Sequence, residues 1–254
     1  MKHPIPEISV ITVVRNNLKG MELTFESLKV QTFTDWEMIV VDGASSDGTL
    51  DYLFYISQGD QRIKVYNQDG TGIYAAMNQG LELSKSKSVW FMNSGDRFFC
   101  DDSLELGIRT FKRDNLDLLI GDYCLDPQTK SHAGPENSSK ISRFDILFGR
   151  NGTCHQSMIF LKSTLVKIGG YSLNYQVASD YDAILGISRI GRVHRSRLML
   201  SQIEGEGFSD RNLYPMYLEK FIIRRMHFPK NKLITALNYV WTLAAITKYL
   251  MRRT

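Results

Sequence analysis

A polar, turn-forming cluster follows directly on a short apolar run, and it is the first place where the chain could do chemistry. Residues 89–92 are apolar and are short enough to form a strand buried on both faces. Asn93, Ser94, Gly95 and Asp96 come next. In an open α/β sheet, ligands bind outside the carboxyl ends of the strands, so a carboxylate at this point could meet a metal ion or a metal-bound phosphate. The alternative is that Asp96 only shapes a turn.

Two earlier apolar runs, 8–14 and 36–41, also end in polar loops, at 15–17 and 42–48. Between and after these runs the pattern predicts helices over 21–30, 50–56 and 73–83 and a strand over 63–66. Strands that alternate with helices at this spacing form right-handed crossovers and a largely parallel sheet. We therefore expect the three polar loops to converge at one edge of the sheet.

The second half of the chain is less regular and contains no internal repeat. Its patterns predict helices over 104–111, 164–168 and 180–190 and strands over 116–120, 156–161 and 198–203. Residues 126–140 are rich in Pro, Ser, Lys and Asn, which predicts an exposed loop. No change of composition marks a domain boundary before about residue 208, so residues 1–210 are expected to form one α/β domain.

The composition is that of an ordinary globular protein, with 43% hydrophobic and 23% charged residues among 254. The net charge of +4 is too small to argue for nucleic-acid binding. The three cysteines have no short-spaced pairing, which indicates neither a disulfide framework nor a zinc site and fits a reducing, cytoplasmic compartment. The first residues lack the apolar core of a signal peptide.

Residues 211–254 are predicted to be a helical tail of different character. Residues 233–250 are apolar almost throughout, include Trp241, and are flanked by Lys and Arg. Asn238 and Lys248 make this stretch a poor membrane span. Two interpretations stay open: the tail closes the core, or it lies on an anionic membrane surface such as the inner face of the cytoplasmic membrane.

Several motifs occur in a characteristic order along the chain. They are ISVITVVRNN at 8–17, WEMIVVDGASSDGT at 36–49, GIYAAMN at 72–78, FMNSGD at 91–96, CHQS at 154–157 and ASDYD at 178–182. Together they resemble the inverting family 2 glycosyltransferases of GT-A fold, and in particular bacterial exopolysaccharide and colanic-acid-type sugar transferases. The resemblance covers about residues 7–210 and implies an α/β fold with a GT-A (Rossmann-like) mixed, mainly parallel sheet flanked by helices.

The resemblance implies a nucleotide site at the carboxyl edge of the sheet. Asp42 would accept the imide N–H of uracil, unless it is only a turn or capping residue. Thr12 and Arg15 lie on the neighbouring strand end and would contact the same nucleotide, although an Arg in a polar loop is as often simply solvated. Asn78 would lie near the ribose and phosphates; its alternative is an ordinary Asn on a helix surface.

Asp96 is predicted to be the metal-linked carboxylate, with Asn93 and Ser94 beside it in the donor site. A divalent ion, Mn²⁺ or Mg²⁺, would bridge the two phosphates and stabilise the leaving group. The chain departs here from the wider family, which carries an Asp-x-Asp motif. Gly43 also stands where many relatives have a second Asp, so the strictness of metal dependence stays open.

The resemblance assigns the catalytic base to Asp180, which would take the proton from the acceptor hydroxyl. A simple helix N-cap is the alternative, and Asp182 is the rival base. His155 would contact acceptor or phosphate, or would be a buried, hydrogen-bonded His. The Gly-rich stretch 204–209 could close over the donor.

The predicted function is therefore transfer of a sugar from a UDP- or GDP-sugar to a lipid-linked oligosaccharide in bacterial surface polysaccharide synthesis, with inversion. The lipid-linked acceptor follows from the family resemblance. A dinucleotide-binding oxidoreductase is disfavoured because no GxGxxG follows the first strand. A non-catalytic, membrane-associated scaffold that binds a sugar nucleotide stays open because the acidic motif is reduced.

Overall fold

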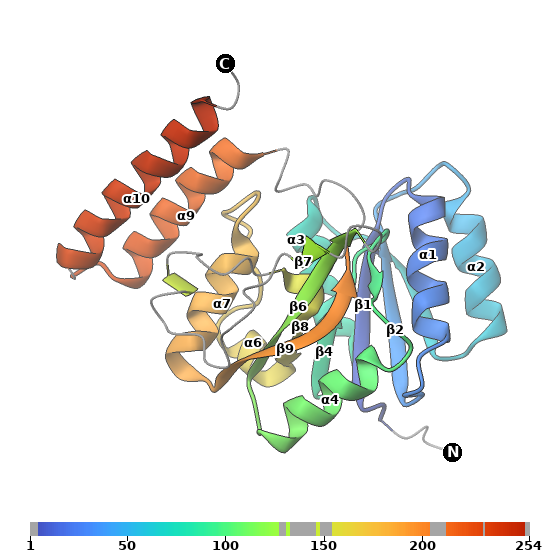
Figure 1. Ribbon diagram of the computed structural model, residues 1–254. Helices are drawn as coiled ribbons and strands as arrows, with labels where there is room; N and C mark the ends of the chain where they lie inside the picture. The colour runs from blue at the N-terminus through green and yellow to red at the C-terminus, as the bar shows by residue number, and fades with distance from the viewer. Residues whose placement is uncertain are drawn as a thin grey trace.

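We describe a computed structural model of the chain. It describes residues 5–126, 131–132, 146–147, 154–203, 212–230 and 232–251. A central sheet carries helices on both faces, and two C-terminal helices stand at one side of it (Figure 1). This confirms the expectation of an α/β fold with a mixed sheet.

The first half is a parallel α/β unit close to the predicted one. Its elements are β1 (Ile8–Val14), α1 (Leu18–Lys29), β2 (Trp36–Asp42), α2 (Thr49–Gly59), β3 (Ile63–Asn67), α3 (Ile73–Leu83) and β4 (Ser88–Phe91). The strands lie in the order β3-β2-β1-β4, and all three pairings are parallel. Every residue of β1, β2 and β4 is buried, which explains why these strands are mainly apolar, with buried polar residues such as Ser9 and Glu37 hydrogen-bonded to each other.

The second half extends the same sheet with mixed pairing. Its elements are β5 (Arg97–Phe98), α4 (Ser103–Arg113), β6 (Leu118–Asp126), β7 (Ser131–His132), the short 3-10 helix η1 (His155–Ser157), β8 (Met158–Leu161), α6 (Lys162–Lys167), α7 (Ser179–Ile190) and β9 (Val193–Gln202). β8 runs antiparallel to both β4 and β6, whereas β9 is parallel to β6. The sheet therefore changes direction beside β4, directly next to the polar cluster that follows it.

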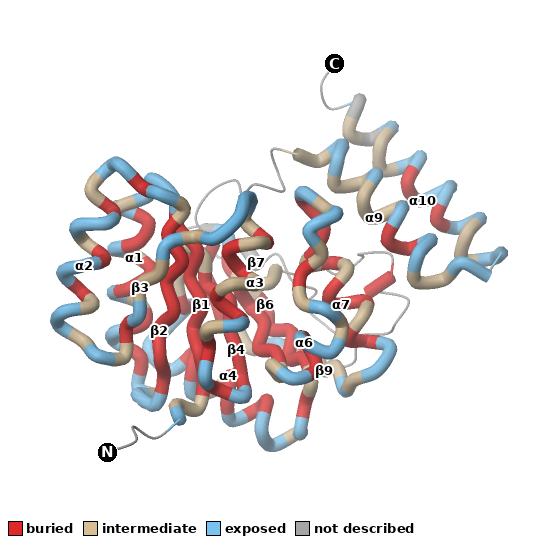
Figure 2. The backbone as a smooth tube through the Cα atoms, turned by 180° about the vertical axis from the view of Figure 1, so that it is seen from behind, coloured by how far each residue is buried: buried red, intermediate tan, exposed pale blue. Residues whose placement is uncertain are grey.

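Two apolar cores lie on the two faces of the sheet, and alternate residues of each strand serve one or the other. Ile11 packs in the core that also contains Met77 of α3 and Ile184 of α7. Val10 packs in the core that contains Phe25 of α1 and Ile108 of α4. The buried strands run through the middle of the molecule between exposed helix surfaces (Figure 2). The sheet is thus a rigid support for the loops at its carboxyl edge.

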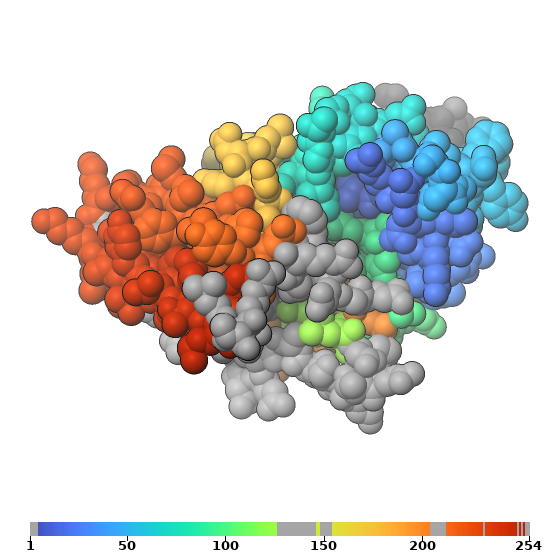
Figure 3. Space-filling view, turned by 90° about the horizontal axis from the view of Figure 1, so that it is seen from above, coloured from blue at the N-terminus to red at the C-terminus, as the bar shows by residue number. Residues whose placement is uncertain are grey.

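The C-terminal helices α9 (Leu213–His227) and α10 (Lys232–Met251) pack against each other, and α9 also contacts α7. Arg224 of α9 is buried and donates to Asn238 and Thr242 of α10. Seen from above, this helical pair lies at the opposite side of the molecule from the N-terminal helices α1 and α2 (Figure 3). Within the described part of the chain, no helix has both the length and the apolar character needed to cross a lipid bilayer.

Three expectations fall wholly or largely outside the described residues. The predicted domain boundary near residue 210 and the Gly-rich stretch 204–209 both lie in the undescribed segment 204–211. The predicted loop over 126–140 is also undescribed except for Asp126 and the short strand β7.

Candidate active site

The carboxyl ends of β1, β2 and β4 form one edge, as the alternation of strands and helices predicts. β1 lies between the other two strands, so Asp42 and the 93–96 turn are separated by roughly 10 Å, two strand spacings. Backbone bonds extend the sheet into both loops: the Gly43 N–H donates to Val14 O at 2.8 Å, and the Ser94 N–H donates to Val13 O at 3.3 Å. The two loops are therefore fixed relative to each other through β1.

Asp42 and Thr12 are fully buried on the same face of the sheet edge. Asp42 Oδ2 accepts the Ser45 N–H at 2.9 Å. Among the described residues, Asp42 Oδ1 and Thr12 Oγ1 are buried side-chain oxygens with no hydrogen-bond partner. Arg15 is exposed and lies beside Gly43, where an added Cβ would come within 3.2 Å of the Arg15 Cβ. Buried polar atoms without partners are costly, so these oxygens suit a polar ligand that would complete their hydrogen bonds.

The turn at 93–96 is held by α1. Gly95 has φ +105°, a left-handed conformation that glycine adopts readily. The Thr24 hydroxyl lies 2.7 Å from Asp96 O and accepts the Gly95 N–H at 3.0 Å. Asn17, at the start of α1, donates to Ser94 O at 3.2 Å. Sequence reasoning missed Thr24; the signal it left is a polar residue on the otherwise apolar, buried face of α1.

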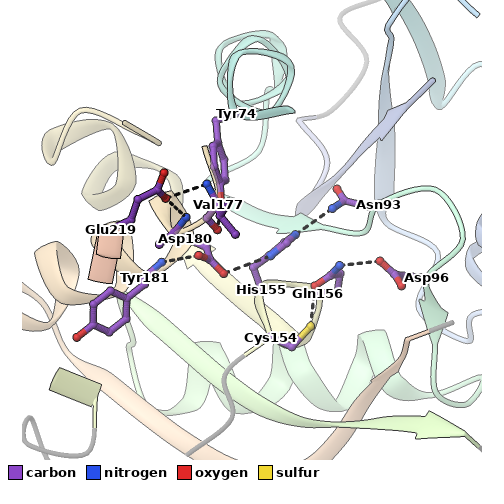
Figure 4. Close-up of polar contacts among 11 residues, drawn as sticks. Tyr74, Asn93, Asp96, Cys154, His155, Gln156, Val177, Asp180, Tyr181 and Glu219 are labelled. Carbon is purple, nitrogen blue, oxygen red and sulfur yellow. Dashed lines mark hydrogen bonds and ion pairs between the residues drawn. The ribbon is translucent and has the colours of Figure 1, made fainter. Parts of the chain in front are cut away.

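Asp96 is buried, and its Oδ2 accepts a hydrogen bond from Gln156 Nε2 at 2.6 Å (Figure 4). Gln156 belongs to η1, the short helix that precedes β8, and its own Oε1 contacts Cys154 Sγ. Gln156 therefore links the 93–96 turn to the segment that carries His155. Sequence reasoning did not give Gln156 a role.

His155 connects the same turn to Asp180. Asn93 Nδ2 lies 3.0 Å from His155 Nε2, and His155 Nδ1 lies 3.7 Å from Asp180 Oδ2 (Figure 4). An amide nitrogen only donates, so Nε2 accepts and the proton of the neutral ring lies on Nδ1, facing Asp180. Asn93, His155 and Asp180 thus form one continuous polar path, with Asp96 reached through Gln156.

Asp180 lies in the first turn of α7 with its side chain 22% exposed. Burial alone raises the pKa of this carboxyl, but the contact with His155, the positive charge of Lys220 and the Tyr181 N–H outweigh burial, so the net pKa is lowered from its usual 3.8. Asp180 is therefore ionised at neutral pH, as a group that accepts a proton must be.

The side chains of two other predicted site residues, Asn78 and Asp182, form hydrogen bonds outside the polar path. Asn78 donates to Tyr171 O at 2.7 Å and accepts the Tyr171 N–H at 2.8 Å, so it joins α3 to the loop before α7. Asp182 Oδ1 lies 2.7 Å from His227 Nε2 on α9. Contact of Asn78 with the ribose and a role of Asp182 in acceptor or phosphate binding stay predictions.

The site offers few protein ligands for a divalent ion. Among the described residues, no group of three or more His, Cys, Asp or Glu side chains could hold a metal ion by itself. Mg²⁺ in nucleotide enzymes is commonly held by one or two carboxylates plus substrate phosphates. Asp96, with the buried and unpartnered Asn93 Oδ1 close by in the same turn, fits a metal held mainly by a diphosphate.

Known proteins provide an independent comparison. The family model described as Glycosyl transferase family 2 matches residues 9–167. An uncharacterized glycosyltransferase of Mycobacterium tuberculosis is 30% identical over 212 residues, which cover 80% of this chain and 76% of that protein. A PGL/p-HBAD biosynthesis glycosyltransferase of the same species is 28% identical over 180 residues, 70% of this chain and 68% of that protein.

The fold has a close structural counterpart. The crystal structure of S. aureus TarS 1–349 in complex with UDP-GlcNAc aligns with a TM-score of 0.73, at 16% identity, over 94% of this chain and 71% of that one. This likeness shows the fold, which is the GT-A fold expected from the motifs. Because the family model covers more than half of the chain and its motifs meet at one sheet edge, the chain belongs to glycosyl transferase family 2.

Proposed function

We propose that this glycosyltransferase moves a hexose-type sugar from a uridine or guanosine diphosphate donor onto a hydroxyl of a lipid-linked saccharide, with inversion at the anomeric carbon. The nucleoside diphosphate binds at the carboxyl edge of β1, β2 and β4. The acceptor approaches from the side of α7. The observation that carries the proposal is the polar path from Asp180 through His155 to the 93–96 turn.

Asp180 acts as the general base. Its ionised carboxylate takes the proton of the acceptor hydroxyl as that oxygen attacks the anomeric carbon. The bond from the anomeric carbon to the diphosphate oxygen breaks, and the nucleoside diphosphate leaves with the electron pair. His155 holds the Asp180 carboxylate and, with its proton on Nδ1, favours the ionised form. No second protein acid is needed, because the diphosphate is a good leaving group.

The donor base and phosphates use the groups at the sheet edge. Asp42 Oδ1 is a buried acceptor suited to a base N–H, and Thr12 Oγ1 lies on the same face to complete its hydrogen bonds with the nucleotide. A bound Mn²⁺ or Mg²⁺ would neutralise the diphosphate charge as a Lewis acid. Asp96 and Asn93 would hold that ion, with Ser94 next to Asn93 in the same turn and Arg15 beside Gly43 for the nucleotide.

Asp180→Asn tests the chemistry directly. Asn has the same shape but cannot take a proton at neutral pH, so sugar transfer should fall by roughly 10²- to 10⁴-fold. Donor affinity, measured by calorimetry with UDP- and GDP-sugars, should stay within a factor of about three because Asp180 does not contact the nucleotide. Retained transfer would remove Asp180 as the base. A native protein that binds the donor but transfers no sugar to any saccharide would instead favour the non-catalytic scaffold.

The acceptor side of the proposal includes binding to an anionic membrane surface at the inner face of the cytoplasmic membrane. Leu233, Leu237, Val240 and Met251 of α10 lie on one stripe and are exposed, Val240 by 68% and Met251 by 73%. Residues 212–251 contain a single acid, Glu219, against several cations. An apolar stripe with a basic surround suits a headgroup region rich in anionic lipid, where a lipid-linked acceptor would be found.

Substitution on the exposed stripe is a sharper test of membrane binding than deletion of α10, because deletion would strip Arg224 of its buried partners Asn238 and Thr242. Leu233→Asp with Val240→Asp, both on this stripe, should reduce sedimentation with vesicles that contain phosphatidylglycerol, without changing the melting temperature. The matched control is Phe54→Asp with Tyr55→Asp on α2, which are as exposed but lie outside the tail. Equal loss in both double variants, or loss in neither, would contradict the proposal.

A further inference from the structure

The first turn of α7, which carries Asp180, lacks the usual side-chain cap. Its N-cap position is Ala178, which offers no side-chain hydrogen bond. Helices are normally started by Ser, Thr, Asp or Asn at this position, because their side-chain oxygens accept the otherwise unpaired backbone N–H groups. Within the turn, the Tyr181 N–H is accepted by Asp180 Oδ1 at 2.7 Å, and the segment before the turn is held from outside α7.

A carboxylate from the C-terminal helix α9 holds the backbone directly before this turn. Glu219 Oε1 accepts the Gln176 N–H at 2.8 Å, and Glu219 Oε2 accepts the Val177 and Ala178 N–H groups at 2.9 and 2.8 Å (Figure 4). Three successive backbone donors thus converge on the two carboxyl oxygens of one side chain. A negative charge at this end is also favoured by the dipole of α7.

The same segment is held from its other side by α3. The Tyr74 hydroxyl donates to Val177 O at 2.7 Å, and Val177 and Ala178 are both buried. The backbone just before Asp180 is therefore clamped between α3 and α9. Asp180 is two residues after Ala178. The position of the clamped backbone therefore determines the direction in which the Asp180 carboxylate points from α7.

We infer that Glu219 is a positioning residue for the catalytic base, and that α9 is for this reason part of the active site and not only an accessory tail. The inference rests on the proposed role of Asp180. Misplacement of a catalytic group by about 1 Å can lower the rate roughly 100-fold, so loss of the clamp should lower kcat. The donor site at β1, β2 and β4 does not touch Glu219 and should be unaffected.

Glu219→Gln is the primary test because it keeps the shape of the side chain but can no longer accept all three N–H groups. We expect kcat to fall roughly 10- to 100-fold, with donor affinity unchanged within about a factor of two. Hydrogen exchange at the amides of residues 176–178 should become faster. The matched control is Glu82→Gln, an exposed Glu on α3, which should leave all three quantities unchanged.

A double-mutant cycle separates positioning from a general structural role. If Glu219 acts through Asp180, Glu219→Gln should have no further effect on the residual transfer rate of Asp180→Asn. An equal loss in both backgrounds, or an unchanged kcat in Glu219→Gln while Asp180→Asn is inactive, would overturn the inference. Full activity in Asp180→Asn would instead overturn the assignment of the base, whatever Glu219→Gln does to amide exchange.

Tyr74→Phe keeps the test decisive if Glu219→Gln does not fold. It removes only the hydroxyl that holds Val177 from the α3 side. We expect a smaller fall in kcat, by a factor of about three to ten, again with donor affinity unchanged. If kcat stays the same in Tyr74→Phe, the clamp does not position the base.

Discussion

The donor edge and the base region reach the same site by different structural means. The donor edge, formed by the ends of β1, β2 and β4, is held by strand register and by backbone bonds that continue from the strands into the loops. The base region, formed by η1, the first turn of α7 and the facing side of α9, is held by side chains that come from distant parts of the chain. Glu219 and Ala178, for example, are 41 residues apart.

This difference indicates where each region is vulnerable. The donor edge inherits the rigidity of a sheet whose strands are buried on both faces, so single side chains there should affect binding more than geometry. The base region has no such support, and its geometry depends on a few charged or polar contacts. Substitutions there should affect turnover through position and charge.

The largest expected contrast is between Asp42→Asn and Asp180→Asn. Asp42→Asn removes a charged acceptor from the donor edge, so the donor Kd should rise roughly 10- to 100-fold, the equivalent of one charged hydrogen bond. Its kcat at saturating donor should change by less than about threefold. Asp180→Asn should show the reverse pattern. Steady-state kinetics measure kcat in both variants, and calorimetry measures the donor Kd. A similar loss of kcat in both variants would contradict the division of roles between the donor edge and the base region.

A smaller effect is expected from Thr24→Val, which tests whether the 93–96 turn depends on α1. Loss of the hydroxyl removes the hydrogen bond to Asp96 O and one of the two acceptors of the Gly95 N–H, the other being Gly20 O, so the free energy of unfolding should fall by about 1–3 kcal/mol. Thr32→Val, an exposed Thr, should change it by less than about 0.5 kcal/mol. Urea unfolding measures both, and equal effects would mean that the turn is held by the sheet alone.

The smallest expected effect is a shift in the pH profile of Lys220→Met. Burial and the contact with His155 have larger effects on the pKa of Asp180. The positive charge of Lys220 lowers this pKa further. Removal of that charge raises this pKa, so the acid limb of kcat/KM should move to higher pH, while Lys220→Arg should keep it in place. If the acid limb of kcat/KM stays at the same pH in Lys220→Met, α9 affects the position of Asp180 but not its pKa.

The same lowered pKa affects folding. A carboxylate whose pKa is lower in the folded than in the unfolded state stabilises the fold above its usual value of 3.8, and this contribution is lost as the pH falls through the folded-state pKa. Lys220→Met should therefore weaken the dependence of stability on pH in the acid range.

The amino-acid sequence by itself determined the sheet and the donor edge. The run at 8–14 and the helix at 73–83 were predicted with the bounds the structure has, because buried parallel strands and amphipathic helices leave periodic patterns in nearby residues. The polar clusters at 42 and 93–96 were found for the same reason, since each directly follows its strand. β5, two residues long, was missed because so short a strand has no pattern of its own.

Only the tertiary structure decided how the base is held. Asp180 was found through its motif, but nothing near it in the sequence indicates Glu219, and Gln156 and Thr24 likewise contact Asp96 from 60 and 72 residues away. Hydrogen bonds between side chains and distant backbone depend on how whole helices pack, and that packing leaves no local period in the sequence. The tail that composition set apart therefore holds the backbone just before the catalytic helix through the Glu219 carboxylate, which the fold alone brings into place.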